Sequence, residues 1–340
     1  DQAAIELFCH RAKNIGADLQ LLRGDMDALT ELVRRLDNLP LAIELAAAHT
    51  RIFSPAQILD RLSSRFRLLR GRRPDAPAHH QSLEAALDWS WELLQPWEQS
   101  CLAQLSAFSG GFRMEAVESV VDLGGFPDAP WVVFVVEALV DRSLVQASSS
   151  HGGQVRFEMY SAVAEYAQAH LEEEERLEVW KRHAQWYAHY GTVAQIQAPR
   201  TEGGGERLRL RCIDRANFNA AVDRAIENEW IELAVLAGQV ASLILGSLGP
   251  WNAGIALGER LLNIPGLTLE QRCRTLINAS WQQFEVDFEG ATWNFEEAYR
   301  LAQEIGDPSI QAACLSNMAV AYNRSGDLEA AKESLKTSVR

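Results

Sequence analysis

Residues 36–48 read LDNLPLAIELAAA, in which a proline opens a run of small and apolar side chains. Proline is tolerated at the first position of a helix, because the amide hydrogen that it lacks would have no partner there. The stretch therefore predicts a short helix that begins at Pro40 and ends near Ala48. Ser54 and Pro55 repeat this start signal as a capping serine followed by a proline, so another helix is expected directly after them.

The chain on both sides of this stretch also has the periodicity of helices. From Met26 to Leu36, apolar residues recur at spacings of three and four, which is one face of a helix. The remaining helices of the first half are expected over residues 3–13, 113–122 and 130–142, and after the start signals at Ser82 and at Gln95-Pro96.

After residue 142 the apolar period changes to that of strands. Leu144 and Val145 are expected to form one short strand, residues 148–153 a polar turn, and Val155 to Met159 a second strand. A long helix is expected over residues 161–175. Three or four helices followed by a β-hairpin is the element order of a winged helix.

The tail from residue 177 onward carries no strand signal and contains an internal repeat. Shifting it against itself by 39 residues aligns Leu276 with Leu315 and Ala291 with Ala330. Each copy ends in a second helix, expected over residues 290–304 and 328–340. The last copy has the small and turn residues of a tetratricopeptide helix–turn–helix (Ala319, Tyr322, Gly326, Asp327 and Ala330). Because one copy cannot bury its own apolar face, the copies are expected to stack into a solenoid.

The sequence therefore predicts a mainly α-helical chain in three domains. The first is a small helical lid domain over residues 1–71. The second is a winged-helix domain with a β-hairpin wing over residues 72–175. The third is an α-solenoid of tetratricopeptide-like repeats over residues 176–340.

Composition and charge exclude several classes of function. The 340 residues are 47% hydrophobic and 23% charged, which is ordinary for a globular protein. The net charge of −14 makes the chain a poor nucleic-acid binder, because it gains no counterion release from phosphates. We find no apolar run near the ~18–20 residues that span a membrane. The five cysteines form no CxxC pair, which favours a reducing cytoplasm with thiols as small core residues.

Lysine is too rare and wrongly placed for a phosphate-binding P-loop. The chain holds four lysines, and none follows a glycine (Lys13, Lys181, Lys332 and Lys336). A P-loop needs Gly-Lys-[Ser/Thr], with the lysine reaching the β- and γ-phosphates. The chain also starts at Asp1 without a methionine and stops inside a helical pattern, so we expect it to be a piece of a longer protein.

The stretch at residues 36–48 resembles the Gly-Leu-Pro-Leu motif of the NB-ARC type of signal-transduction ATPases with numerous domains, the STAND ATPases. Its bacterial members carry a long Leu-Pro-Leu-Ala-Ile-Glu-Leu-Ala-Ala string here, and Asn38 stands where the motif has glycine. Further strings resemble the family's winged helix and the region after it, in the same order (residues 80–83, 86–90, 106–112, 138–145 and 213–222).

The resemblance implies a nucleotide switch of which this chain is the part after the P-loop domain. In the family that domain binds ATP or ADP with Mg, and the lid and winged helix close over the nucleotide. Leu39 and Pro40 would then be nucleotide contacts, Pro40 on the adenine side. The family's winged helix often ends in Met-His-Asp, whose histidine contacts the ADP phosphate. Here the position reads Met159-Tyr160-Ser161, and Tyr160 could donate a hydrogen bond but not carry the charge.

The expected function is the regulatory and sensor portion of such a switch, in transcriptional or kinase-linked regulation. Its partners would be the missing P-loop domain in cis and a protein or small-molecule signal at the repeats, with signal-dependent homo-oligomers as a further expectation. DNA would be bound only through an output domain outside this chain, and no membrane is expected. The sequence offers no catalytic residues, no metal ligands and no cofactor of its own, so we expect no enzyme activity from this chain alone.

Two other readings of the sequence stay open. One is a tetratricopeptide scaffold without a nucleotide link. The other is a winged helix that itself binds DNA, although residues 148–153 contain no Lys or Arg and Arg156 stands beside Glu158. Six arginines within residues 61–73 are either an anion-binding patch or a solvated linker.

Overall fold

The computed structural model describes residues 2–16, 25–36, 38–62, 78–149, 155–197, 203–284 and 286–339. The chain forms two compact units. The N-terminal unit comprises Asp1–Ala107 and Gly111–Arg176, and the repeat unit comprises Phe108–Gly110 and Leu177–Arg340. Most of the arginine-rich segment at residues 61–73 lies outside the described residues. The predicted division into three domains at residues 71 and 175 stays a prediction.

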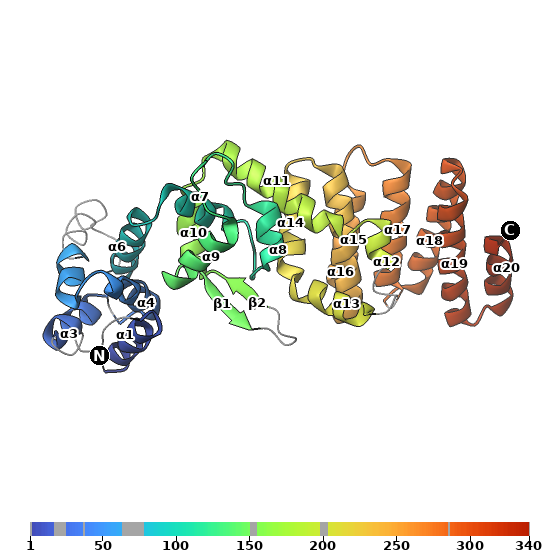
Figure 1. The fold of residues 1–340 in the computed structure, drawn as a ribbon. Helices are drawn as coiled ribbons and strands as arrows, with labels where there is room; N and C mark the ends of the chain where they lie inside the picture. The colour runs from blue at the N-terminus through green and yellow to red at the C-terminus, as the bar shows by residue number, and fades with distance from the viewer. Residues whose placement is uncertain are drawn as a thin grey trace. The chain divides into compact units, whose positions relative to one another are not determined.

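The predicted fold class is confirmed: the described chain is mainly α-helical, with one two-stranded sheet, a winged helix and a solenoid of helices (Figure 1). The N-terminal unit begins with a group of short helices in which α1 packs against α4. They are α1 (Gln2–Asn14), α3 (Met26–Arg35), α4 (Pro40–Ala48), the 3₁₀ turn η1 (His49–Arg51) and a helix over residues 55–62. Pro40 occupies the first position of α4, as the sequence predicts. Phe8, Leu29 and Ile43 are fully buried between these helices.

The winged helix follows in the same unit. Its elements are α6 (Ala78–Glu92), α7 (Pro96–Leu105), α8 (Met114–Val120), α9 (Val132–Asp141), β1 (Gln146–Ser149), β2 (Val155–Glu158) and α10 (Ser161–Gln168). The two strands pair antiparallel, with Gln146 opposite Glu158. Phe112 adds a single bridge to Phe157, so three chain segments meet at the base of the wing.

Two details of the predicted winged helix are wrong. Leu144 and Val145 form no strand, because their amides both donate to the Leu139 carbonyl at the end of α9, at N···O distances of 3.0 and 3.3 Å. Their side chains are buried all the same, which explains the apolar signal. The strand lies two residues later, and it includes Ser148 and Ser149 of the predicted turn.

The predicted helix over residues 161–175 is two helices. α10 ends at Gln168, and α11 (Glu173–His189) begins at the acidic run. Carboxylates in a first turn are favoured by the positive end of the helix dipole, so the run Glu173–Glu175 starts a helix rather than ending one.

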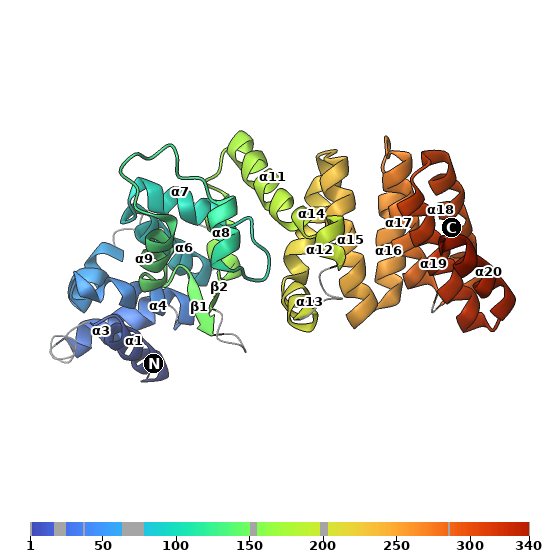
Figure 2. The same cartoon turned by 45° about the vertical axis from the view of Figure 1, so that its right-hand side comes forward.

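The repeat unit is an array of helices in which those from α14 onward pack against one another in chain order (Figures 1 and 2). After α11 they are α12 (Val193–Gln197), α13 (Gly204–Ile213), α14 (Arg215–Glu227), α15 (Ile231–Leu248), α16 (Trp251–Leu262), α17 (Leu269–Gln283), α18 (Phe288–Ile305), α19 (Pro308–Ser325) and α20 (Leu328–Val339). Gly326 ends α19 at a positive φ of 88°, and the Asp327 carboxylate accepts the Ala330 amide of α20 at 3.0 Å. The predicted Gly-Asp turn is therefore present.

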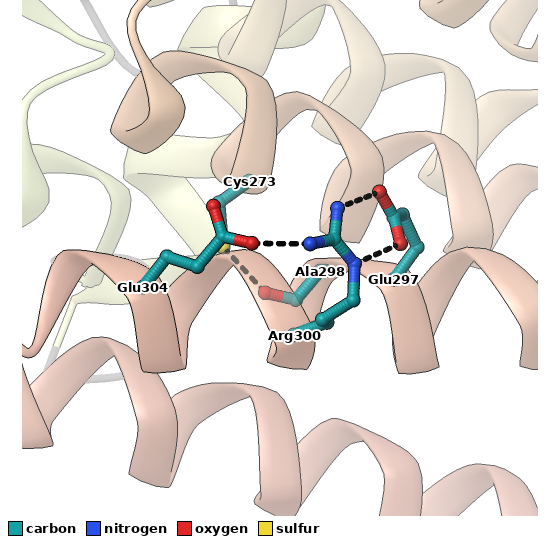
Figure 3. A network of polar contacts seen from close by, with 5 residues as sticks. All are labelled: Cys273, Glu297, Ala298, Arg300 and Glu304. Atoms are coloured by element: carbon teal, nitrogen blue, oxygen red, sulfur yellow. Dashed lines mark hydrogen bonds and ion pairs between the residues drawn. The ribbon is translucent and has the colours of Figure 1, made fainter.

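Polar contacts within α18 and sulfur contacts between helices stabilise the array. On α18, Arg300 donates to the carboxylates of Glu297 and Glu304 (Figure 3). The Cys273 thiol donates to the Ala298 carbonyl at 3.1 Å and lies 3.8 Å from the Cys314 sulfur. Both cysteines are fully buried, in agreement with the expectation that thiols serve as small core residues.

The expectation that no apolar run comes near the length that spans a membrane is wrong for α15, which could cross a membrane by length and composition alone. The same holds for core helices of globular proteins, and 56% of α15 is buried inside the structure. The apolar character of α15 therefore has an explanation in the packing against α14, α16 and α17.

Candidate functional site

A polar cavity of about 280 Å³ opens in the N-terminal unit, between α1, α4, the end of α9 and both strands. Its polar lining consists of Arg11, Glu44, Ser143, Gln146, Ser148 and Glu158. This cavity brings together two segments that carry the resemblance, residues 36–48 and 138–145.

Arg11 organises one wall of the polar cavity. Its Nε donates to Ser143 Oγ at 2.6 Å and its Nη2 to the Val140 carbonyl at 2.8 Å. A guanidinium at the last carbonyls of a helix is stabilised by the negative end of the helix dipole. Ser143 itself has a positive φ of 62°, which turns the chain out of α9 towards β1. Arg11 thus fixes α1 against the point where the winged helix turns into its wing.

The electrostatics of the polar cavity favour hydrogen-bond donors over phosphate. Two carboxylates, Glu44 and Glu158, face one guanidinium, that of Arg11. Carboxylates accept hydrogen bonds from hydroxyl and amino groups and repel phosphate oxygens. The lining therefore suits hydroxyl or amino groups of a ligand, and a phosphate would need cations from elsewhere.

The structure places the three predicted nucleotide contacts beside the cavity and not in its wall. Leu39 caps α4 and is half-buried, Pro40 is exposed at the first position of α4, and Tyr160 is half-buried at the start of α10. Glu44 lies one helical turn after Pro40 and hence on the same side of α4. Glu158 lies two residues before Tyr160 and ends β2. The predicted contact roles of Leu39, Pro40 and Tyr160 stay predictions.

Arg11 and Ser143 were missed by the sequence analysis. Ser143 lies within the string at residues 138–145, but nothing in that string marks a left-handed serine. Arg11 pairs with a residue 132 positions away, and such a pairing has no local sequence signal.

Replacing Arg11 with alanine should destabilise the N-terminal unit by about 2 kcal/mol, since hydrogen bonds to a charged group are worth ~1.5–3 kcal/mol. Urea denaturation followed by tryptophan fluorescence would measure the loss. The matched control is Arg34→Ala on α3, whose side chain is 60% exposed and which should cost less than about 0.5 kcal/mol. Equal losses in the two variants would contradict the role given to Arg11.

A second polar surface is the helix-turn-helix, formed by α8, α9 and the loop between them. Residues 114–141 contain six acidic residues and neither Lys nor Arg. In the described part of the wing, Arg156 is only 8% exposed and donates to the Gly111 carbonyl at 2.9 Å. This arginine is therefore engaged inside the protein and does not point to a nucleic acid.

The repeat unit has an apolar groove of about 650 Å³ where α15 ends and α16 begins. Leu248, Trp251 and Val286 line it with side chains that are 58%, 46% and 58% exposed.

No group of three or more His, Cys, Asp or Glu side chains that could hold a metal ion exists among the described residues.

A family model described as "winged helix-turn-helix domain" matches residues 94–172. The chain is 32% identical over 331 residues to proteins of Mycobacterium bovis and Mycobacterium tuberculosis that are named as candidate HTH-type transcriptional regulators. The match covers 92% of this chain and 36% of each relative, so the chain spans about a third of their length. An uncharacterized Mycobacterium tuberculosis protein is 35% identical over 174 residues, which is 50% of this chain and 43% of that protein.

Among solved structures, the chain is similar to a signal transduction ATPase with numerous domains from Pyrococcus horikoshii that has a tetratricopeptide repeat sensor. The identity is 14% and the TM-score 0.30, over 82% of this chain and 53% of that one. At this TM-score the likeness supports no statement about the domains of the chain.

Proposed function

We propose that this chain is the regulatory and sensor portion of a nucleotide-dependent signalling switch of the STAND type. The lid helices and the winged helix close over a nucleotide that a P-loop domain elsewhere in the protein holds. One observation carries the proposal: the side of α4 that follows Pro40 and the strand end that precedes Tyr160 meet at one polar cavity. These are the two segments in which the resemblance implies nucleotide contacts.

The lining of the polar cavity supports different roles for this chain and for the P-loop domain in binding the nucleotide. Glu44 and Glu158 can accept hydrogen bonds from ribose hydroxyls or an adenine amino group. The phosphates and Mg would be held by the P-loop domain, because this chain has no Gly-Lys dipeptide. The chain alone then has no ATPase activity.

The names of the mycobacterial relatives support a regulatory role in transcription, carried out in the cytoplasm. The signal would be a protein or small molecule bound at the repeats, and the groove beside Trp251 offers it an apolar surface. Such a signal changes the switch only by binding one of its states more tightly than the other.

Residues 1–340 alone should bind Mg-ATP and Mg-ADP only weakly and hydrolyse neither. The reason is the missing phosphate cradle, together with the excess of carboxylates in the polar cavity. Isothermal titration calorimetry should find dissociation constants above about 1 μM for both nucleotides. A dissociation constant of about 1 μM corresponds to a binding free energy of ~8 kcal/mol. Submicromolar binding would contradict the proposal that the P-loop domain, and not this chain, holds the phosphates and Mg.

The full-length protein provides the direct test of the closing role. Pro40→Ala should speed the release of a bound fluorescent ADP analogue about fivefold, since losing one apolar contact costs ~1 kcal/mol. The matched control is Pro96→Ala, which removes another exposed proline from the first position of a helix, α7. If both changes leave the release rate unaltered, α4 does not contact the nucleotide and the proposal fails.

A DNA-binding winged helix is the second candidate function, favoured by the match to a winged helix-turn-helix domain. DNA recognition by such domains needs a basic footprint on the recognition helix and wing. The absence of Lys and Arg from residues 114–141 weighs against it.

A further inference from the structure

The exposed side of α9 presents two large aromatic rings to solvent. Trp131 caps the helix and is 60% exposed, and Phe134 follows one turn later and is 56% exposed. The two rings pack edge to face with centroids 6.1 Å apart. The opposite side of α9 is buried in the N-terminal unit through Val135, Val136 and Leu139. The aromatic pair therefore lies outside the hydrophobic core of the N-terminal unit.

Carboxylates continue the same side of α9 towards its C-terminus. Phe134, Glu137 and Asp141 follow one another at spacings of three and four, which keeps them on one face of a helix. Glu137 is exposed, and Asp141 forms an ion pair with Arg51 at 3.4 Å in which both side chains are 58% exposed. An ion pair this exposed contributes little, so Asp141 can exchange it for another cation.

In a DNA-binding helix-turn-helix, the second helix enters the major groove, and Lys and Arg neutralise the phosphates around it. In this protein α9 is that second helix, and the stretch from α8 to the end of α9 carries six carboxylates and neither Lys nor Arg (Glu115, Glu118, Asp122, Asp128, Glu137 and Asp141). Arg51, which pairs with Asp141, and Arg142, which pairs with Glu98, adjoin the end of α9, and the carboxylates outnumber these cations. Phosphates of DNA, and anionic lipid headgroups equally, are repelled by such a surface. A second copy of this chain would bring the same carboxylates and a net charge of −14.

We propose that the exposed side of α9 binds a basic segment of a protein partner. Lysine or arginine side chains of the partner pair with Glu137 and Asp141. Apolar side chains, or an arginine guanidinium stacked on a ring, cover Trp131 and Phe134. The winged helix is thereby a protein-docking module in which an acidic and aromatic surface stands where a DNA reader has a basic one.

The probe for this surface is a fluorescently labelled helical peptide of about 18 residues made only of Leu, Ala and Arg, long enough to form a helix on binding. Fluorescence anisotropy would give its dissociation constant for the full chain. Trp131→Ser and Glu137→Gln should each weaken binding about tenfold, because aromatic anchors and desolvated charges dominate such interfaces. Both residues are exposed, so neither substitution should unfold the protein.

The controls separate this surface from the net charge of the chain. Trp293→Ser removes an aromatic side chain that is 62% exposed on α18, and Glu174→Gln removes an exposed carboxylate on α11. Both should leave the peptide affinity unchanged within about twofold. Ser309→Ala, on the exposed surface of α19, should do the same. Equal losses in test and control variants would mean that the peptide binds the overall charge, and the proposal would be overturned. It would equally be overturned if a labelled random duplex DNA bound the protein directly and Trp131→Ser or Glu137→Gln weakened that binding.

Discussion

Replacing Gly191 with alanine is expected to destabilise the repeat unit by about 3 kcal/mol or more, at the upper end of what overpacking costs. Gly191 is buried directly after α11, and an added Cβ would lie 1.9 Å from the Leu236 carbonyl oxygen of α15. The obstacle is backbone inside a long helix, so it cannot rotate away as a side chain could. The melting temperature should fall by about 6–12 °C for a unit of this size.

Gly205→Ala is the matched control for Gly191→Ala. Gly205 lies in the first turn of α13, and nothing lies within 4 Å of its would-be Cβ. Alanine has a higher helix propensity than glycine, so this change should stabilise the protein by up to about 1 kcal/mol. Differential scanning calorimetry of the two variants would measure both effects. If Gly191→Ala melts at the wild-type temperature, α11 and α15 do not approach as closely as described.

Acidification from pH 7 to pH 5 is expected to remove about 2 kcal/mol of stability from each compact unit, through His49 in the N-terminal unit and His183 in the repeat unit. Burial lowers the pKa of His183 to about 3, and the nearby Arg224 lowers it further. Burial likewise lowers the pKa of His49 to about 4, with Arg142 as the second cause. Both folded values lie below the unfolded value of 6.5, so the unfolded chain takes up the protons first. Stability is therefore complete above pH 6.5 and falls as the pH drops towards 4.

The surroundings of His183 explain why it stays neutral. Its Nε2 donates to Asn217 Oδ1 at 3.2 Å, and the same oxygen accepts the Ser109 amide at 2.7 Å. The Nδ1 atom then carries no proton and faces the Arg224 guanidinium at 3.4 Å. A second proton on the ring would be placed against this cation in a site without solvent.

Urea denaturation at pH 7 and pH 5 would measure the loss. His183→Gln should reduce the difference between the two pH values by about 2 kcal/mol, and the exposed His189→Gln should leave it unchanged. An identical pH dependence in wild type and His183→Gln would refute the assignment. His49→Gln provides the same comparison for the N-terminal unit.

Local signals in the sequence were sufficient to predict most helices of this fold. The start of α4 at Pro40 and that of α7 at Pro96 depend only on neighbouring residues, and both were predicted at the right position. The turn at Gly326 was predicted equally well, because a glycine that ends a helix is a local requirement. The winged helix followed from the order of such elements.

Features that depend on distant contacts could not be predicted. The strand expected at Leu144 is absent because the Leu139 carbonyl takes its amide, which requires the left-handed Ser143. The polar cavity depends on the pairing of Arg11 with Ser143, which brings together residues far apart in the chain. The sequence indicated two of the segments beside the cavity through a resemblance and gave no signal for its arginine.

The loop Phe108–Gly110 has a consequence for how proteins of this kind can be inherited or recombined. It belongs to the repeat unit, where Ser109 is hydrogen-bonded to Asn217, although the residues on both of its sides belong to the N-terminal unit. A gene fusion that joined a foreign set of repeats at Leu177 would keep this contact only if those repeats also placed an asparagine against the loop. The repeats are therefore not an independently exchangeable module. Exchange between relatives should succeed only when the loop Phe108–Gly110 and the repeats from Leu177 onward are transferred together.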